Sequence, residues 1–214
     1  MIAIVKHRPG RAAHGDPMHR WLIMAALPLV MGAAALAWAD DVADCANMET
    51  MLKAAPATVV SACRRLAEQD NAHAEDQLGR MYYEGLGVPQ DYTEAAKWWH
   101  KAADQGNAVA QYNLAVMHYF GQAMPQDYAM AAKLYLEAAE QGDAYAEYDL
   151  GRMYRNGRGV PQDYVQAYMW WNLAAAQGDT EAAKQRDMIA ARMTPSQISQ
   201  GRALAAARKP TTGQ

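Results

Sequence analysis

One six-residue stretch, GVPQDY, occurs at residues 87–92 and again at residues 159–164, and a divergent copy, AMPQDY, lies between them at 123–128. The copies begin at residues 87, 123 and 159, so each starts 36 residues after the previous one. A repeat of this length is typical of solenoids, in which antiparallel helix pairs stack on one another. This period constrains the fold more than any other feature of the chain.

The first part of each repeat carries small and apolar residues at helical spacing. In the first copy Ala74, Leu78 and Met81 are four and three residues apart, which places them on one helical face, and the same types recur in the next two copies. The residue after Leu78 is Gly79, and its counterparts are Ala115 and Gly151. A side chain this small allows the partner helix to approach closely.

The hexapeptide marks the end of one helix and the start of the next. Gly85 and its counterparts occupy the position where a helix ends in the left-handed conformation. Pro89 prevents the first helix from continuing, and Asp91 is an N-cap residue for the second. Each repeat needs such a signal once, which explains why the chain carries it three times.

The second helix of each repeat carries bulky residues in its middle and an Ala pair near its end. Trp98-Trp99 and Trp170-Trp171 flank the Leu134-Tyr135 pair of the central copy. Paired Trp residues can form a sugar-stacking platform. Their repeat position favours core packing instead for one member of each pair, since such rings bury a large apolar area.

A targeting segment is predicted at the N-terminus. Residues 18–20 supply a positive charge, residues 21–36 are mainly apolar, and Ala37-Trp38-Ala39 matches an A-x-A cleavage site. The pattern predicts cleavage after Ala39, with either Met1 or Met18 as the start. An uncleaved membrane anchor is the alternative, but Pro28 and the small-residue exit favour cleavage. We therefore expect an exported protein, periplasmic or secreted, that meets the membrane only through this segment if it is uncleaved.

The charge balance argues against nucleic acid as a partner. The full chain has a net charge of −3. Loss of residues 1–39 removes four of the 20 basic and one of the 23 acidic side chains, which leaves a net charge of −6. The sequence contains no basic block, and an acidic protein without one is poorly suited to a polyanion.

Two cysteines, Cys45 and Cys63, remain in the exported chain. Export leads to an oxidising compartment, so a disulfide between them is the leading interpretation. Two separate buried thiols are the alternative, because the sequence does not give their distance.

The repeats resemble the Sel1-like repeat family. The resemblance rests on the A-x-A-x-x-x-L-G-x-x-Y-x-x-G run at 72–85 and 144–157, on the GVPQDY turn and on the A-A-x-Q-G ending. It implies an all-α fold, a right-handed α-solenoid of antiparallel helix pairs, with three full repeats and degenerate capping helices at both ends. The expected organisation is an extension and signal peptide (1–39), a degenerate helix pair (40–70), repeats at 71–106, 107–142 and 143–178, capping helices (179–208) and a frayed tail (209–214).

The resemblance also implies function. Members of this family are adaptors and scaffolds in protein complexes. Some cysteine-rich bacterial relatives are proposed to bind or hydrolyse β-lactams, but they carry cysteines within the repeats, and this chain has none after Cys63. Sequence motifs for a catalytic nucleophile, a zinc site or a phosphate-binding loop are absent, so we expect no enzyme activity, no metal and no cofactor.

On the first helix of each repeat, the residues that recur in every copy form the packing face. Candidate partner-binding positions are those that differ between repeats and lie at helical spacing on the remaining face, which we expect to be the concave side. Tyr and Arg, the residue types that anchor protein interfaces, are frequent among them. They are His73, Asp76, Arg80 and Tyr83 in the first repeat; Val109, Tyr112, Val116 and Tyr119 in the second; and Tyr145, Tyr148, Arg152 and Arg155 in the third. A Tyr-rich patch that grades into an Arg-rich end suits an extended segment with an acidic or carboxylate terminus. The alternative is a surface that varies because nothing constrains it.

The sequence thus predicts a non-catalytic adaptor that binds another protein, of the cell envelope, on its concave face. Two alternatives stay open. One is an envelope enzyme or ligand-binding protein that acts on cell-wall material, and the other is a secreted factor that acts on a host.

Overall fold

The structure is a computed structural model that describes residues 41, 43, 45 and 55–208 of the 214-residue chain. The predicted targeting segment, most of the first half of the predicted helix pair at 40–70 and the tail at 209–214 lie outside the described residues. From residue 55 to residue 208 the chain forms nine helices and no strand, so the predicted all-α solenoid is confirmed.

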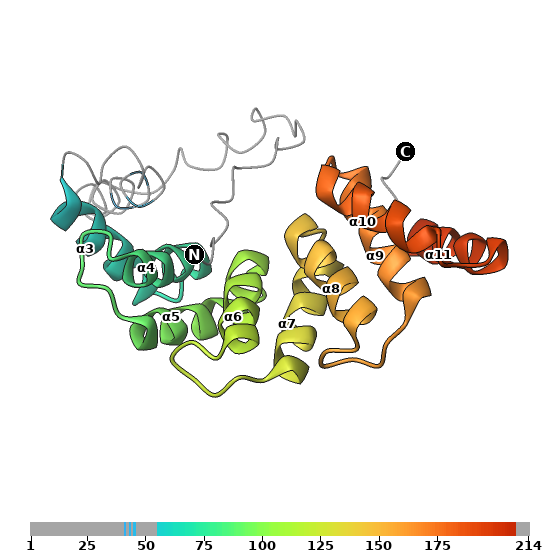
Figure 1. Cartoon of the computed structure of the whole chain (residues 1–214). Coiled ribbons are helices and arrows are strands. Elements are labelled where there is room, and N and C mark those ends of the chain that lie inside the picture. The colour runs from blue at the N-terminus through green and yellow to red at the C-terminus, as the bar shows by residue number, and fades with distance from the viewer. Residues whose placement is uncertain (1–40, 42, 44, 46–54, 209–214) are drawn as a thin grey trace, which may run out of the picture.

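The helices follow one another along a curve, with α3 at one end and α10 and α11 at the other (Figure 1). They are α3 (Pro56–Ala67), α4 (Ala72–Glu84), α5 (Tyr92–Asp104), α6 (Ala108–Phe120), α7 (Tyr128–Glu140), α8 (Ala144–Asn156), α9 (Tyr164–Ala176), α10 (Thr180–Ala190) and α11 (Pro195–Arg208).

The first helices of the repeats, α4, α6 and α8, line the inner side of the curve, and α5, α7 and α9 lie on the outer side (Figure 1). Contacts between neighbouring inner helices agree with this arrangement. The Tyr83 hydroxyl at the end of α4 donates to Gln122 Oε1 just beyond α6, at 3.0 Å. The rings of Tyr112 on α6 and Tyr145 on α8 have their centroids 6.1 Å apart.

In each repeat the first helix ends at the predicted glycine and the second begins after the predicted aspartate cap. The Asp91 carboxylate accepts hydrogen bonds from the backbone N–H groups of Thr93 and Glu94, and Asp127 and Asp163 cap α7 and α9 in the same way. Gly85 ends α4 in the left-handed conformation with φ of 71°. Because these signals are local, they act in the same way in every repeat.

The small residue in each inner helix faces the large ring of its partner helix. A Cβ added to Gly79 would lie 2.5 Å from the Trp99 side chain, and one added to Gly151 would lie 2.5 Å from Trp171. In the central repeat, where Ala115 replaces the glycine, the ring is the smaller Tyr135. The pairing of residue sizes across each helix pair therefore keeps the packing dense.

The C-terminal end departs from simple stacking, because α10 and α11 both pack against α9. Thr194 Oγ1 accepts from the Gln197 backbone N–H at 3.3 Å, and Gln197 Oε1 accepts from the Thr194 backbone N–H at 2.9 Å, so the two residues form a capping box at the start of α11. Helix α11 packs back against α9 and buries Trp170. The Arg208 guanidinium lies 4.7 Å from the centroid of the Trp170 ring. The expected core packing of one ring in each pair is confirmed by Trp99 and Trp171, and in the third repeat α11 covers Trp170 as well.

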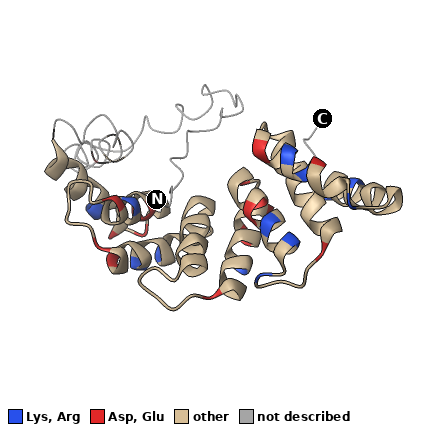
Figure 2. Cartoon of the chain, in the orientation of Figure 1, with Lys and Arg blue, Asp and Glu red and all other residues tan. Residues whose placement is uncertain are grey.

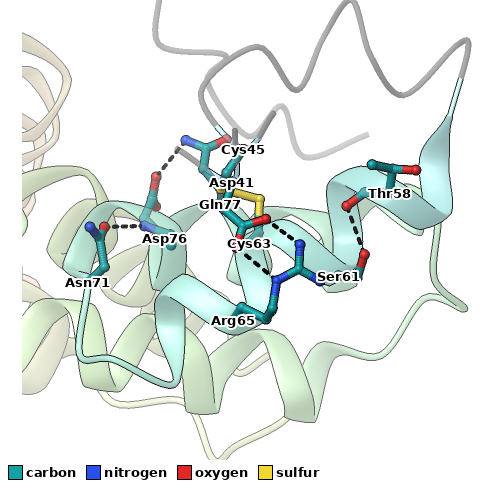
Figure 3. The surroundings of a disulfide bond; sticks show 10 residues. Asp41, Cys45, Thr58, Ser61, Cys63, Arg65, Asn71, Asp76 and Gln77 are labelled. Atoms are coloured by element: carbon teal, nitrogen blue, oxygen red, sulfur yellow. Dashed lines mark hydrogen bonds and ion pairs between the residues drawn. A yellow bond between two sulfur atoms is a disulfide. The ribbon is translucent and has the colours of Figure 1, made fainter. Parts of the chain in front are cut away.

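A disulfide joins Cys45 to Cys63 on α3, with their Cα atoms 5.0 Å apart (Figure 3). Both cysteines are buried, and Arg65 Nε donates to Asp41 Oδ2 at 2.8 Å beside them. This end of the solenoid is thus linked covalently to the chain that precedes α3. No helix among the described residues has the length and apolar character needed to cross a membrane.

Candidate partner-binding surface

The twelve residues predicted to bind a partner fall into two groups by burial. Seven are exposed or half-buried: His73, Arg80, Val109, Tyr145, Tyr148, Arg152 and Arg155. Five are buried: Asp76, Tyr83, Tyr112, Val116 and Tyr119. For these five the expectation of an open surface position is wrong, since neighbouring helices cover their side chains.

In the first repeat the buried residues bond to other parts of the solenoid. Asp76 Oδ1 accepts a hydrogen bond from Trp99 Nε1 at 3.1 Å, which fixes the ring against Gly79. The Tyr83 ring packs 5.4 Å from the Trp99 ring, centroid to centroid. These side chains hold α4 to its neighbours and are not free to anchor a partner.

In the central part of the arc a polar cluster lies below the surface, between α6 and α8. The Tyr112 hydroxyl, on a side chain only 6% exposed, bonds to Asp149 Oδ2 at 3.3 Å. Arg152 Nη2 lies 2.9 Å from Asp149 Oδ1. Burial raises the pKa of Asp149 above its ordinary value, and the nearby Arg152 charge opposes that rise. Burial and the Asp149 carboxylate together raise the pKa of Tyr112.

The central inner helix, α6, carries no Asp, Glu, Lys or Arg, and Figure 2 shows it without a charged residue between charged neighbours. Val109 and Phe120 are 11 residues apart, three helical turns, so they lie on the same face. Phe120 is 43% exposed, and Tyr145 on α8 is 40% exposed. We call Val109, Phe120, Tyr145 and Tyr148 the inner apolar surface.

Sequence reasoning missed Phe120. Its counterparts are Glu84 and Asn156, so the position differs between repeats as strongly as the predicted ones. It is also the only Phe of the chain. A comparison of residue types along the last turn of each inner helix would have found it.

A second set of polar contacts recurs once in each repeat, where a glutamine after the outer helix bonds to a buried side chain of the inner helix. Gln105 Nε2 donates to Glu75 Oε2 at 2.5 Å, and Gln177 Nε2 donates to Glu147 Oε2 at 2.9 Å. In the central repeat Gln141 donates to Gln111 Oε1, so an amide replaces the carboxylate. Burial raises the pKa of Glu147 to about 7, from an ordinary value of 4.5.

This shift predicts that the folded chain loses stability as the pH rises. The folded state binds the Glu147 proton more tightly than the unfolded state does, so the stabilisation is complete below pH ~4.5 and is lost as the pH rises through about 7. Glu147→Gln should reduce the pH-dependent change in the free energy of unfolding by about 1–2 kcal/mol, a figure that allows for partial solvent screening. The substitution replaces the titrating carboxyl group with an amide and reproduces the Gln111–Gln141 pair of the central repeat. Urea unfolding at several pH values measures the effect. Exposed Glu68→Gln is the control, and an unchanged pH dependence in Glu147→Gln would contradict the assignment.

The described residues offer little for a metal or a small ligand. They contain no group of three or more His, Cys, Asp or Glu side chains placed to hold a metal ion. A surface hollow of about 300 Å³ lies among Gln162, Asp163, Tyr164, Val165 and Gln197. Its carboxylate, Asp163, already caps α9 through the backbone N–H groups of Val165 and Gln166.

Comparison with known proteins gives one family. The sequence model of the Sel1 repeat matches residues 72–107, 108–143 and 144–179, which together make up half of the chain. Among curated proteins, none matches the chain.

Two solved structures are similar over most of the chain. One is a protective antigen present in uropathogenic Escherichia coli strains that displays an SLR fold, at 28% identity and a TM-score of 0.71 over 82% of this chain. The other is a Sel1 repeat protein from Oxalobacter formigenes, at 35% identity and a TM-score of 0.59 over 62% of this chain. The matched part covers only 38% of the length of each of those two proteins.

Proposed function

We propose, from the premise that this chain belongs to the Sel1 repeat family, that it is an exported adaptor that binds another protein on the inner side of its helix arc. Proteins built from Sel1 repeats commonly mediate protein–protein interactions, and the fold is typically a non-catalytic scaffold. The bacterial origin of the similar structures and the N-terminal targeting pattern support export. We expect the partner to be a protein of the cell envelope.

The inner apolar surface is the observation that carries this proposal. It consists of the exposed Phe120 and Tyr145 and the half-buried Val109 and Tyr148. Charged residues flank it on both sides, with Arg80 and Glu84 on α4 and Arg152 on α8. An apolar centre within a polar rim is the usual composition of a protein interface, and aromatic residues dominate its binding energy.

Photocrosslinking in cells tests the proposal. A photoreactive amino acid at Tyr145 should capture one dominant protein, because this ring is exposed on the inner side. The same probe at Lys133, exposed on the outer helix α7, is the matched control and should not capture that protein. Tyr112 is unsuitable for the probe, because its side chain is buried between helices.

A double substitution on the same surface gives the quantitative prediction. Phe120→Ser with Tyr145→Ser should weaken partner capture by roughly tenfold or more, the effect expected for two aromatic anchors. Both rings are substantially exposed, so the urea unfolding midpoint should change little. Full capture by the well-folded double variant, or equal capture from Lys133, would contradict binding on the inner side.

A further inference from the structure

Three arginines gather where the third inner helix ends. Arg152 and Arg155 lie in the second half of α8, and Arg158 follows in the loop. Arg152 and Arg155 are half-buried, whereas Arg158 is exposed. The cluster borders the inner apolar surface through Arg152, which lies two turns along α8 from Tyr145 on the same face.

Aromatic rings hold all three guanidinium groups. Arg152 lies 5.0 Å from the centroid of the Tyr119 ring, and Arg158 Nη1 donates a hydrogen bond to the Tyr119 hydroxyl. Arg158 is also 5.6 Å from the Tyr128 ring, and Arg155 lies 5.8 Å from the Trp171 ring. A cation over an aromatic face is attracted to it, so the positive groups are held in place before any partner arrives.

Positive charge exceeds negative charge in this cluster. Arg152 pairs with Asp149, but over residues 55–208 no ion pair is formed by Arg155 or Arg158. Arg155 Nη1 donates to the uncharged Gln185 Oε1 at 3.0 Å. The carboxylates on neighbouring elements are engaged elsewhere: Asp127 and Asp163 cap helices, and Glu181 pairs with Lys184. Two positive charges therefore lack a carboxylate partner among the described residues.

The repeat itself does not require these arginines. Cations stabilise the C-terminal end of a helix, so a structural role has to be weighed. The counterparts of Arg152, Arg155 and Arg158 are Arg80, Tyr83 and Leu86 in the first repeat and Val116, Tyr119 and Gln122 in the second. Helices α4 and α6 end in the same way without a cluster. Arg152 thus has an arginine counterpart in Arg80, whereas Arg155 and Arg158 occur in the third repeat alone.

We propose that this arginine cluster binds an acidic segment of a partner protein. The inference rests on the proposed function, and it adds the charge and the placement of the bound segment. Carboxylate side chains pair with Arg155 and Arg158, and the apolar residues next to them lie against Tyr145 and Tyr148. Arginine matches this partner because its planar group forms two parallel hydrogen bonds to one carboxylate. Nucleic acid fits less well, since the chain as a whole has a net charge of −3.

Peptide binding tests the charge recognition directly. Fluorescence anisotropy of the purified chain is measured with labelled peptides of eight Glu, eight Gln or eight Lys residues and with a single-stranded dT oligonucleotide of equal length. The Glu peptide should bind, and its affinity should fall with added salt. In the Arg155→Gln/Arg158→Gln variant the affinity should fall roughly tenfold. The matched control, Lys133→Gln/Arg192→Gln, removes two exposed charges elsewhere and should leave the affinity unchanged.

Any of three results would overturn the proposal. The Glu peptide does not bind, the two double variants lose equal affinity for it, or the dT oligonucleotide binds as tightly as the Glu peptide does. Arg158→Gln alone is a second test in case the double variant misfolds, because this residue lies in an exposed loop. It should give a smaller loss of Glu-peptide affinity.

Crosslinking from Tyr145 separates this inference from the proposed function. Capture that persists unchanged in Arg155→Gln/Arg158→Gln overturns the acidic-segment proposal and leaves the adaptor function intact. Capture that falls together with peptide affinity supports both. Peptide binding that depends on the arginines, without any protein captured from Tyr145, supports the acidic ligand and counts against the proposed protein-binding surface.

Discussion

Gly159→Ala is expected to lower the free energy of unfolding by about 2–5 kcal/mol. Gly159 has φ of 70°, and an added Cβ would lie 2.0 Å from the backbone oxygen of Tyr128, at the start of α7. The left-handed conformation costs an L-residue about 1–2 kcal/mol. Overpacking against backbone atoms costs about 1–3 kcal/mol more, because a main chain cannot rotate away as a flexible side chain can. Urea unfolding followed by far-UV circular dichroism measures the loss.

The central repeat supplies the matched control for this prediction. Ala123 occupies the position equivalent to Gly159 and has φ of 59°, so an alanine is already accommodated there. Ala123→Gly should therefore raise the free energy of unfolding slightly, by less than about 1 kcal/mol, since relief of strain is offset by the greater freedom of glycine in the unfolded chain. A loss of no more than about 1 kcal/mol in Gly159→Ala would show that the contact with Tyr128 does not restrict the turn.

Gly151→Ala is the second large effect, and we expect it to cost about 2–4 kcal/mol. The added Cβ would lie 2.5 Å from Trp171 Nε1 and 2.6 Å from Trp171 Cδ1. The buried ring has to move, which also strains its hydrogen bond to the Tyr148 carbonyl oxygen, now 3.0 Å long. Overpacking and a weakened buried hydrogen bond contribute about 1–3 and about 1 kcal/mol.

The natural pair of the central repeat, Ala115 with Tyr135, suggests how the loss can be reversed. Trp171→Tyr alone should cost about 2–3 kcal/mol, because the smaller ring leaves a cavity over Gly151. In Gly151→Ala/Trp171→Tyr the new methyl group fills part of that cavity. The double variant should therefore lose at least about 1 kcal/mol less than the two single losses added together. A double-mutant cycle by urea unfolding gives this coupling energy, and strictly additive losses would refute the packing relation.

The candidate site was only partly predictable from the sequence. The pattern of differences between repeats selected α4, α6 and α8, which line the inner side, and included Tyr145 and Arg152, which are accessible in the structure. It also included Tyr112 and Tyr119, whose rings the neighbouring helices bury. A single helix fixes which residues share a face, but the exposure of a residue near the edge of that face depends on the size of the side chains opposite.

The same limit applies to the charges. Arg155 belonged to the predicted set, but Arg158 lies in a loop outside the helical pattern. Arg152 and Arg158 lie close together because both contact Tyr119 on α6, whereas Arg155 lies against Trp171 on α9. Sequence spacing carries no information about such contacts between elements.

The sequence by itself determined the repeat, the helical class and the start and end of nearly every helix. These features depend on interactions within a few residues, such as the Asp91 cap and the left-handed Gly85, so every copy of the motif produces them again. Only the tertiary structure decided that α11 packs across α9 and covers Trp170, and that Phe120 and Tyr145 stay exposed while Tyr112 and Tyr119 are buried. Those outcomes depend on packing between residues far apart in the chain, where the volumes and charges of both partners decide the contact.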